Sequence, residues 1–419
     1  MKLVKTYGRT AKAAAALIEA IEARGAVSTA KVEPVVSAIL AAVRKRGDAA
    51  VREYATKYDQ LAKGAALLVS RDEMKSAWDA TAPELRAAME TAQANIRAFA
   101  EAQMPAEWTI SPVDGLKTGQ IVRAIESVGC YVPGGRYPLP STLLMTVTPA
   151  RVAGVERIVV CSPKPARETI AAAYLAGVTE FYRVGGAQAI AALAFGTETI
   201  TAVDKIVGPG NLYVTAAKMA VSQHTGIDMP AGPTEIVVTS ENGDPIGIAA
   251  DLVAQAEHDT EALAIFITTK ADLAEEILLE VKRQAQGNDI ARQSLEAQGF
   301  AFVTKTVEEA HELTNRLAPE HLTVDAGADL RWVKNAGSIF IGHHTPQSMG
   351  DYISGPNHVL PTGRNGRTRG GLSVFDFVKV ITVQQYTLDA LREIGPHTIA
   401  LAEAEGLRGH AESVRVRMR

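Results

Sequence analysis

The first hundred residues place apolar positions with the period of amphipathic helices. Apolar residues recur three and four positions apart in segments such as 35–45 and 83–99, as they do along one face of a helix. No motif in this part of the chain identifies a chemistry. We therefore expect a helical region from the N-terminus to about residue 110.

From about residue 126 the pattern changes to short apolar runs that end in Gly or Pro turns. Ala-rich amphipathic stretches follow these turns, which is the alternation of strand and helix in a parallel α/β sheet. Four strands are predicted, at 125–132, 157–161, 181–184 and 203–207. Residues 128–234 are thus expected to form a compact Rossmann-like domain.

A second α/β pattern runs from residue 235 to 377. We expect its strands at 235–239, 264–268, 301–304 and 338–341. The tail at 378–419 has a mostly helical pattern and is too polar to belong to either sheet. The expected fold class is α/β, with two Rossmann-like domains and small helical segments at both ends of the chain.

Composition narrows the class of protein. With 419 residues the chain is long enough for two or three domains, each with its own core. Its two cysteines, Cys130 and Cys161, lie in apolar segments, so we expect a reduced intracellular protein. The net charge of -4, without a long basic block, argues against a nucleic-acid partner. No run reaches the roughly 18–20 apolar residues of a membrane helix, so we expect a cytoplasmic enzyme that acts on small molecules.

Three Gly-rich turns follow predicted strands, at 133–135, 185–186 and 208–211. Gly allows backbone N–H groups to approach a phosphate at a helix N-terminus. None of the turns matches G-x-G-x-x-G, and a tight turn alone would also explain each of them. Their common position, at the carboxyl ends of successive strands, favours a nucleotide site.

Two further groups of residues could carry chemistry. Gln255 and His258 lie three apart in a predicted helix and so share a face, with Asp251 on the same stripe. Pro319 is typical of the first residue of a helix, which would place Glu320 and His321 at its positive end. On the residues alone, a His near a helix end is usually a surface or satisfied core residue. An ordinary helix start with an exposed Glu and His would look the same as the second pattern.

Three other candidates are weaker on the residues alone. The loop at 350–358 contains many turn formers and also Asp351 and His358, and loops often carry functional residues. The adjacent pair at 343–344 lies in a polar loop, where we expect solvated imidazoles rather than metal ligands. Cys130 has apolar neighbours, so we expect an inert, packed thiol.

Seven segments in order along the chain closely resemble the histidinol dehydrogenase family. They are VGCYVPGG at 128–135, VGGAQAIAALA at 184–194, VGPGN at 207–211, DMPAGP at 228–233, QAEH at 255–258, PEHL at 319–322, and the stretch from GDY at 350 to HVLPT ending at 362. The similarity covers about residue 120 to the C-terminus. It implies an enzyme that oxidises L-histidinol through an aldehyde to L-histidine, with two NAD and a bound zinc ion.

The resemblance also implies roles for individual residues. It assigns the acid–base pair to Glu320 and His321. It assigns zinc to Gln255, His258, Asp351 and His410. It assigns substrate contacts to these four residues and to Thr234, His321, His358 and Glu405. It assigns NAD contacts to Tyr131, Gln188 and Asn211.

The resemblance further implies a division of the chain and a partner. An N-terminal helical segment at 1–24 and the tail at 378–419 would form a dimerisation region, with the tail exchanged in a homodimer that has shared active sites. Residues 25–127 and 235–377 would form the domain with zinc and the acid–base pair, and 128–234 the NAD domain.

The sequence departs from the family at two places. Thr234 stands where the family usually has a substrate-binding Ser, and the loop at 136–137 differs from several members. Related dehydrogenases of other polar alcohols, including the sulfopropanediol type, share much of the scaffold. A dehydrogenase of that kind and a catalytically silent zinc- or nucleotide-binding homologue are the alternatives.

Overall fold

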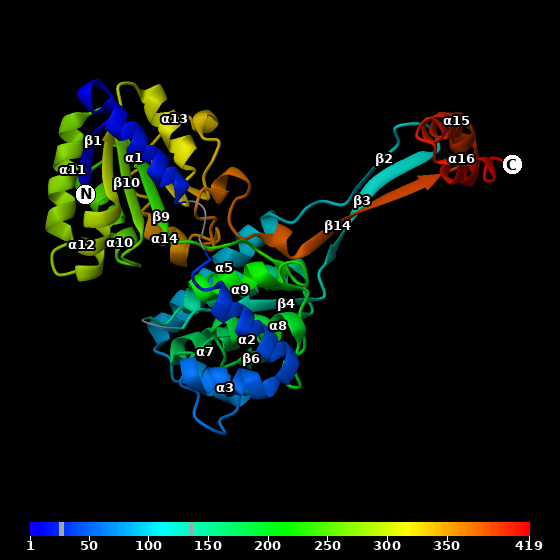
Figure 1. Ribbon diagram of the computed structural model, residues 1–419, viewed down its shortest axis with the longest axis horizontal. Coiled ribbons are helices and arrows are strands. Elements are labelled where there is room, and N and C mark those ends of the chain that lie inside the picture. The colour runs from blue at the N-terminus through cyan, green and yellow to red at the C-terminus, as the bar shows by residue number, and fades with distance from the viewer. Residues whose placement is uncertain (25–28, 135–136) are drawn as a thin grey trace.

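Two α/β lobes and a projecting arm make up the chain. The computed structural model describes residues 1–24, 29–134 and 137–419. The lobes stand one above the other in Figure 1, and the arm leaves the region between them and ends in the C-terminal helices. The α/β fold expected from the sequence is confirmed.

The lower lobe is built on a five-stranded parallel sheet of order β6-β5-β4-β7-β8. Its strands are β4 (Ser127–Tyr131), β5 (Arg157–Cys161), β6 (Glu180–Tyr182), β7 (Lys205–Val207) and β8 (Gly226–Ile227). Its connecting helices are α6 (Pro140–Ala153), α7 (Arg167–Leu175), α8 (Gly186–Phe195) and α9 (Leu212–Val221). All four predicted strands are present, and every residue of the central strand β4 is buried, as a strand covered on both faces requires.

The upper lobe is built on a six-stranded parallel sheet of order β1-β11-β10-β9-β12-β13. Its strands are β1 (Lys2–Lys5), β9 (Glu235–Thr239), β10 (Leu263–Thr268), β11 (Gly299–Val303), β12 (His321–Val324) and β13 (Ser338–Ile341). Its helices are α1 (Ala11–Ala23), α10 (Pro245–Ala256), α11 (Ala271–Gln284), α12 (Asp289–Gln298), α13 (Val307–Leu317) and α14 (Gln347–Tyr352). Short 3₁₀ helices lie at Gly8–Thr10, Leu330–Trp332, Asn365–Arg367 and Val374–Asp376.

Two local predictions in this lobe are wrong. The segment at Pro319 does not begin a helix: α13 ends at Leu317, and His321 begins strand β12, which pairs with β9 and β13. The apolar and β-branched residues after His321 are buried between these strands, and this burial outweighs the local helix signal. The N-terminal segment at 1–24 is not wholly helical either, because β1 pairs with β11 before α1 begins.

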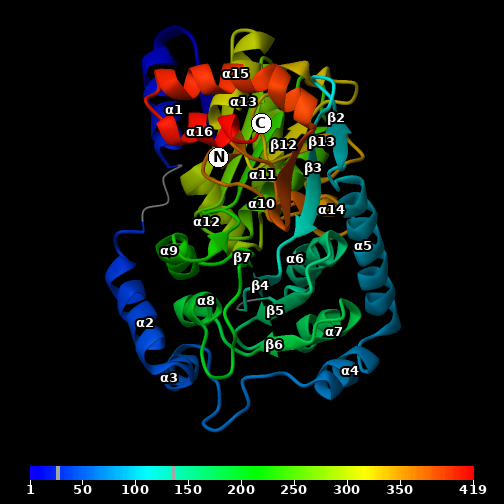
Figure 2. The ribbon, with the colours of Figure 1, turned by 90° about the vertical axis from the view of Figure 1, so that its right-hand side faces the viewer.

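The helices at 33–102 belong to the lower lobe, whereas we expected residues 25–127 in the lobe with the acid–base pair. These helices are α2 (Glu33–Arg46), α3 (Asp48–Tyr58), α4 (Arg71–Asp79) and α5 (Pro83–Ala102), and Figure 2 shows them around the five-stranded sheet. Val43 of α2 shares a core with Leu193, and Met74 of α4 shares one with Phe181. Burial of their apolar faces therefore fixes where these helices pack.

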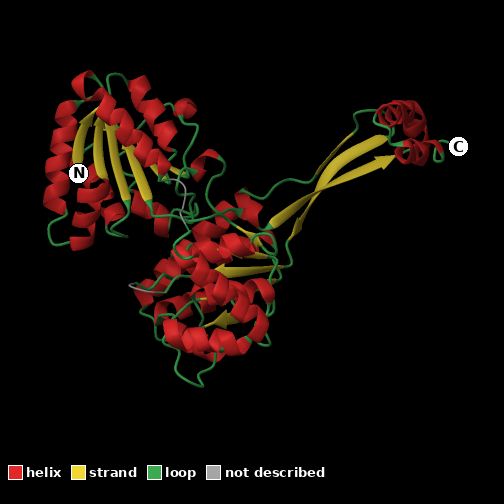
Figure 3. Cartoon of the chain, viewed as in Figure 1, coloured by secondary structure: helices red, strands yellow, loops and turns green. Residues whose placement is uncertain are grey.

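The arm is a three-stranded antiparallel sheet of order β14-β3-β2 that carries two helices. Its elements are β2 (Trp108–Ile110), β3 (Leu116–Ala124), β14 (Val378–Tyr386), α15 (Leu388–Ala404) and α16 (Arg408–Arg415). Figure 3 shows the two long strands reaching away from both lobes. We expected a mostly helical tail from residue 378. Its first nine residues form strand β14 instead.

No helix among the described residues is both long and apolar enough to span a bilayer.

Candidate active site

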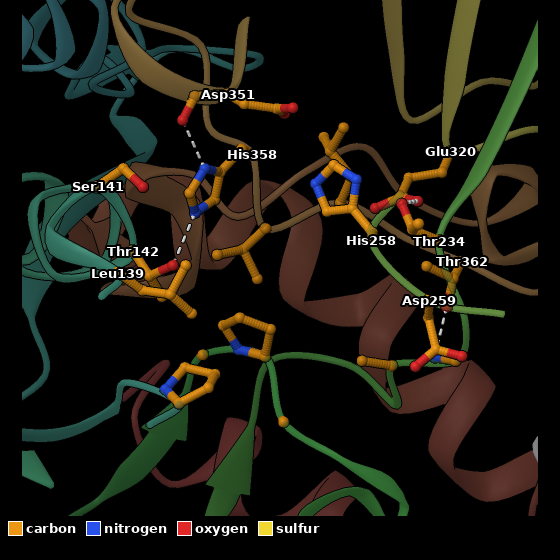
Figure 4. A pocket seen from close by; sticks show the side chains of 18 of the residues that line it. Leu139, Ser141, Thr142, Thr234, His258, Asp259, Glu320, Asp351, His358 and Thr362 are labelled. Carbon is orange, nitrogen blue, oxygen red and sulfur yellow. Dashed lines mark hydrogen bonds between the residues drawn. The ribbon is translucent and has the colours of Figure 1, made fainter. Parts of the chain in front are cut away.

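A cavity of about 520 Å³ opens between the two lobes. The lower lobe contributes loops at the carboxyl ends of its strands, among them the stretch from Gly208 to Asn211. The upper lobe contributes most of the candidate residues, namely Thr234, Gln255, His258, Glu320, His321, Asp351 and His358. Figure 4 shows several of these side chains around the open space. Segments more than a hundred residues apart in the sequence therefore meet in one site.

The Glu320 carboxylate is held in place by two donors from the start of β9. Its Oε2 accepts a hydrogen bond from Thr234 Oγ1 at 2.5 Å and another from the Glu235 backbone N–H at 2.8 Å. The residue is only 6% exposed. The Thr234 hydroxyl thus anchors the Glu320 carboxylate, and the methyl group that Thr adds is compatible with this contact.

The two ring nitrogens of His321 have different surroundings. Its Nδ1 lies 3.1 Å from the Glu235 carbonyl oxygen, to which it donates in the tautomer that places the proton there. Its Nε2 has no hydrogen-bond partner among the described residues and lies 3.4 Å from Asp351 Oδ1. Burial lowers the pKa of His321, but the charge of Glu320 and the contact with Asp351 raise it to about 10.

Gln255 and His258 lie at the end of α10 rather than in its middle. Gln255 is fully buried, donates to Thr234 Oγ1 from Nε2, and accepts from Gln347 Nε2 at 2.6 Å. His258 lies two residues past the last helical residue and contacts the Ala254 carbonyl through Nδ1 at 3.0 Å. Its Nε2 is left for a ligand in the cavity that it lines.

His358 connects the two lobes. Its Nδ1 lies 2.7 Å from the Asp351 backbone oxygen, and its Nε2 lies 3.2 Å from Thr142 Oγ1 on α6 of the lower lobe; Figure 4 marks both contacts. The Asp351 carboxylate accepts from Gln347 Nε2 at 3.2 Å. Burial lowers the pKa of His358, which keeps its imidazole neutral at ordinary pH.

A single chain supplies only part of the expected zinc set. Gln255, His258 and Asp351 line one cavity and offer oxygen and nitrogen donors of the kind that zinc accepts. Among the described residues of this chain, no group of three or more His, Cys, Asp or Glu side chains could hold a metal ion. The donor set fits zinc if a further imidazole reaches the cavity from elsewhere.

A second cavity, of about 650 Å³, adjoins the carboxyl edge of the five-stranded sheet. Tyr131, Gln188 and Asn211 all line it. The Tyr131 hydroxyl accepts from the Gly186 N–H at 3.1 Å, and Gln188 Nε2 donates to Asp59 at 3.1 Å. The three residues, which lie at or after the ends of β4, β6 and β7, are thus brought together at one cavity.

Four other residues at this second cavity were not singled out from the sequence. They are Tyr58, Asp59, Lys164 and Tyr213. Tyr58 and Asp59 belong to the helical region that carries no motif, so no local signal marks them. Two residues that the sequence singled out, 135 in the Gly-rich turn and 136 in the loop that differs from the family, lie outside the described residues. The next residue of that loop, Tyr137, lines the first cavity.

Glu405 and His410 are not brought to the cavity by their own chain. Glu405 follows the last residue of α15 and His410 lies in α16, both exposed at the far end of the arm. Figure 1 shows this end well separated from the two lobes.

Three residues expected to be inert have the surroundings that we predicted for them. His343 and His344 are exposed, and the His343 Nδ1 accepts from the Asp244 N–H at 3.3 Å. Cys130 is completely buried, and this burial raises the pKa of its thiol to about 12. A thiol with so high a pKa is a poor nucleophile.

Comparison with known proteins gives a consistent result. The family model described as histidinol dehydrogenase matches residues 22–418. The histidinol dehydrogenase of Gluconobacter oxydans is 46% identical over 95% of both chains, and that of Methanothermobacter thermautotrophicus is 46% identical over 92% of this chain and 93% of its own. The crystal structure of histidinol dehydrogenase from Elizabethkingia anophelis is 36% identical, with a TM-score of 0.89 over 92% of each chain. By sequence and by fold, the chain belongs to the histidinol dehydrogenase family.

Proposed function

We propose that this chain oxidises L-histidinol through L-histidinaldehyde to L-histidine in histidine biosynthesis, with two NAD. The observation that carries the proposal is the pairing of Glu320 and His321 at the wall of a cavity between two lobes, beside a second cavity at a sheet edge. NAD, when bound in the second cavity, accepts a hydride in each of the two oxidations. The residues of the chain must then hold the substrate and move protons.

His321 is proposed as the base that takes the proton of the alcohol. His321 lines the cavity, and its buried Nε2 has no hydrogen-bond partner among the described residues, so a ligand hydroxyl could become its partner. The two charges that raise its pKa belong to Glu320 and Asp351. A cation bound at Asp351 would offset one of these charges, which favours the neutral imidazole that a base requires.

Glu320 is proposed as the base that activates water to hydrate the aldehyde. Its carboxylate accepts two hydrogen bonds on Oε2, and it lines the same cavity as His321. These hydrogen bonds fix one carboxylate oxygen, so that the group is held in place to accept a proton from water. Retention of the aldehyde between the two oxidations would prevent loss of a reactive intermediate.

Gln255, His258 and Asp351 are the proposed zinc ligands from the lobe, and His410 of a second copy is the fourth. Zinc would anchor the imidazole and amino nitrogens of the substrate, so that its hydroxyl lies near His321. Thr234, His358 and Glu405 are the other proposed substrate contacts. Thr234 and His358 line the cavity, which supports their part of the assignment.

The second cavity is proposed as the NAD site, with contacts from Tyr131, Gln188 and Asn211. Exposed aromatic rings of Tyr58 and Tyr213 line this cavity and offer flat apolar surfaces for a nucleotide base. A homodimer with exchanged tails and a cytoplasmic location remain predictions. The exposed His410 and the projecting arm support the dimer.

One assay tests the proposal. Purified protein with zinc and NAD should form two NADH for each L-histidinol consumed, and sulfopropanediol should give little or none. NADH formation from the diol, with histidinol inert, would instead favour a dehydrogenase of another polar alcohol.

A further inference from the structure

A buried ion pair lies at the floor of the cavity between the lobes. Lys218 is on α9, Asp228 follows β8, and their charged groups are in direct contact. The side chains are only 3% and 1% exposed. Both residues line the proposed substrate cavity, yet neither has a part in the proton transfers described above.

The pair binds both backbone polar groups of one residue, Gly208. Lys218 Nζ donates to the Gly208 carbonyl at 2.9 Å, and the Gly208 N–H donates to Asp228 Oδ2 at 2.7 Å. With the ion pair itself, these contacts form a closed ring. The two peptide groups that flank Gly208 are therefore fixed in orientation.

Only Gly fits at position 208. Its φ is +111°, and a Cβ atom there would lie 2.1 Å from the backbone oxygen of Tyr131. This close approach sets the loop from Gly208 to Asn211 against the end of β4. Asn211 caps α9 through Oδ1, which accepts from the N–H groups of Tyr213 and Val214.

The loop held in this way is a wall between two cavities. Asn211 and Gly134 line both the cavity between the lobes and the cavity at the sheet edge. A hydride passing from a substrate in one cavity to a dinucleotide in the other must cross this boundary. Lys218 is seven residues after Asn211 on the same face of α9, so the ion pair also fixes the helix that Asn211 begins.

We propose that the Lys218–Asp228 pair is a positioning device, which holds the Gly208–Asn211 loop so that cofactor and substrate meet at Asn211. The inference rests on the proposed function. A buried ion pair often contributes little net stability compared with apolar residues, because desolvation offsets the attraction between its charges. The main effect of the ion pair is therefore expected to be on the geometry of the loop rather than on the stability of the fold.

The test compares two double variants. Lys218→Met/Asp228→Asn removes both charges and so avoids an unpaired buried charge, while Lys218→Gln/Asp228→Asn keeps a neutral donor for the Gly208 carbonyl. The control, Arg157→Met/Glu180→Gln, removes a half-buried pair at the opposite edge of the same sheet. Each protein is examined by hydrogen exchange without ligands, by NAD binding, and by kcat and KM for NAD.

In the Met/Asn variant we expect faster hydrogen exchange at the backbone amides of 208–214 and an about tenfold weaker affinity for NAD. A tenfold change corresponds to the loss of about one well-placed contact. The Gln/Asn variant should recover part of both losses, and the control should show neither change even if its Tm falls. Wild-type exchange and NAD affinity in a folded Met/Asn variant would overturn the proposal, as would equal defects in the control. If the Met/Asn variant does not fold, the Gln/Asn variant is compared with the control instead. Hydrogen exchange and NAD affinity equal to those of the wild type in that variant would also overturn the proposal.

The outcome is separable from that of the proposed function. If wild-type protein binds NAD but does not oxidise histidinol, the substrate assignment fails, while exchange and NAD affinity still decide the role of the pair. If wild-type protein binds no NAD, the assignment of a cofactor to this boundary is wrong and the inference fails with it.

Discussion

At the scale of single residues, Glu235 connects the two proposed bases. Its backbone N–H donates to Glu320, and its carbonyl contacts His321 Nδ1. Its own carboxyl group is buried, with Oε1 accepting from the Gly363 N–H at 3.1 Å. Burial, followed by the charge of Glu320, raises the pKa of Glu235 to about 8. A neutral carboxylic acid at Glu235 is therefore expected beside Glu320 at neutral pH.

Glu235→Gln should remove a pH dependence of stability. The pKa of Glu235 is 4.5 when unperturbed and about 8 when folded, so the folded state binds more protons in this window and the wild type loses stability as pH rises through it. Compared with its difference from the wild type at low pH, Glu235→Gln should gain stability on the order of 4 kcal/mol by pH 8 and less than about 0.5 kcal/mol at pH 4.5. Urea unfolding at several pH values measures this difference, and a difference independent of pH would contradict the assignment.

Glu320→Gln should slow the second oxidation more than the first. Gln keeps the shape and one acceptor for Thr234, but it is not a base, so hydration of the aldehyde should lose about 100- to 1000-fold. His321→Asn should impair both oxidations, because it removes the base for the alcohol. Stopped-flow measurement of each half-reaction, started from the alcohol and from the aldehyde, separates the two roles; equal losses in Glu320→Gln would exclude water activation.

At the scale of elements, the sequence predicts a strand well when the strand is an apolar run bounded by turns. It predicts poorly a strand that is very short or exposed to solvent. The runs at 157–161 and 235–239 are apolar, buried on both faces and ended by turns, and both strands have the predicted bounds. Strand β12 was missed, since four residues after Pro carry too short a pattern. Strand β14 was missed because its residues are exposed along nearly their whole length.

The site follows the same rule. Residues within motifs, such as Glu320, His321 and Gln255, are found in the expected cavity. Asp59 and Tyr58 were not predictable, because only the packing of α3 against the distant α8 brings them to the second cavity. Such long-range burial leaves no signal within a short window of sequence.

The turn after β4 depends on close packing that only Gly allows. A Cβ atom at Gly134 would lie 1.9 Å from the Pro163 carbonyl oxygen, so Gly134→Ala must displace the wall of both cavities. We expect an about tenfold higher KM for NAD and a stability loss of about 1–3 kcal/mol. Gly370→Ala is the control, because a Cβ atom there has no neighbour closer than 3.9 Å; unchanged NAD kinetics in Gly134→Ala would contradict this account.

The three zinc ligands proposed within the upper lobe lie in α10, just after it and in α14, so metal should be needed for turnover but not for the fold. Leu252 of α10 packs in a core of the upper lobe, and Gln347 of α14 donates to Gln255 at 2.6 Å, so both helices have contacts that need no metal. A chelator should abolish NADH formation and leave the circular dichroism spectrum unchanged, with activity restored by added zinc. Full activity in metal-free protein, verified by elemental analysis, would mean that the ligand assignment is wrong.

At the scale of the whole molecule, the arm has an apolar surface that its own chain leaves exposed. Val380, Ile381 and Val383 of β14 are between 42% and 47% exposed, and Leu401 of α15 is 67% exposed. A large apolar surface of this kind usually meets a partner. Because α15 and α16 lie at the far end of the long strands β3 and β14, away from both lobes, they are placed to reach a second copy.

The last prediction is that each active site is shared between two chains. The lobes hold Gln255, His258 and Asp351 around one cavity, while His410 is exposed at the end of the arm of the same chain. In a two-fold homodimer with exchanged arms, each cavity would receive the His410 of the other copy. Mixed dimers of His410→Ala and His321→Asn subunits would then contain one site with both substitutions and one wholly intact site. Co-expression should therefore restore about a quarter of wild-type activity, since random pairing makes half of all dimers mixed and half of their sites intact. Parents that stay inactive when mixed, with mixed dimers verified by native mass spectrometry, would show that the arm serves its own chain.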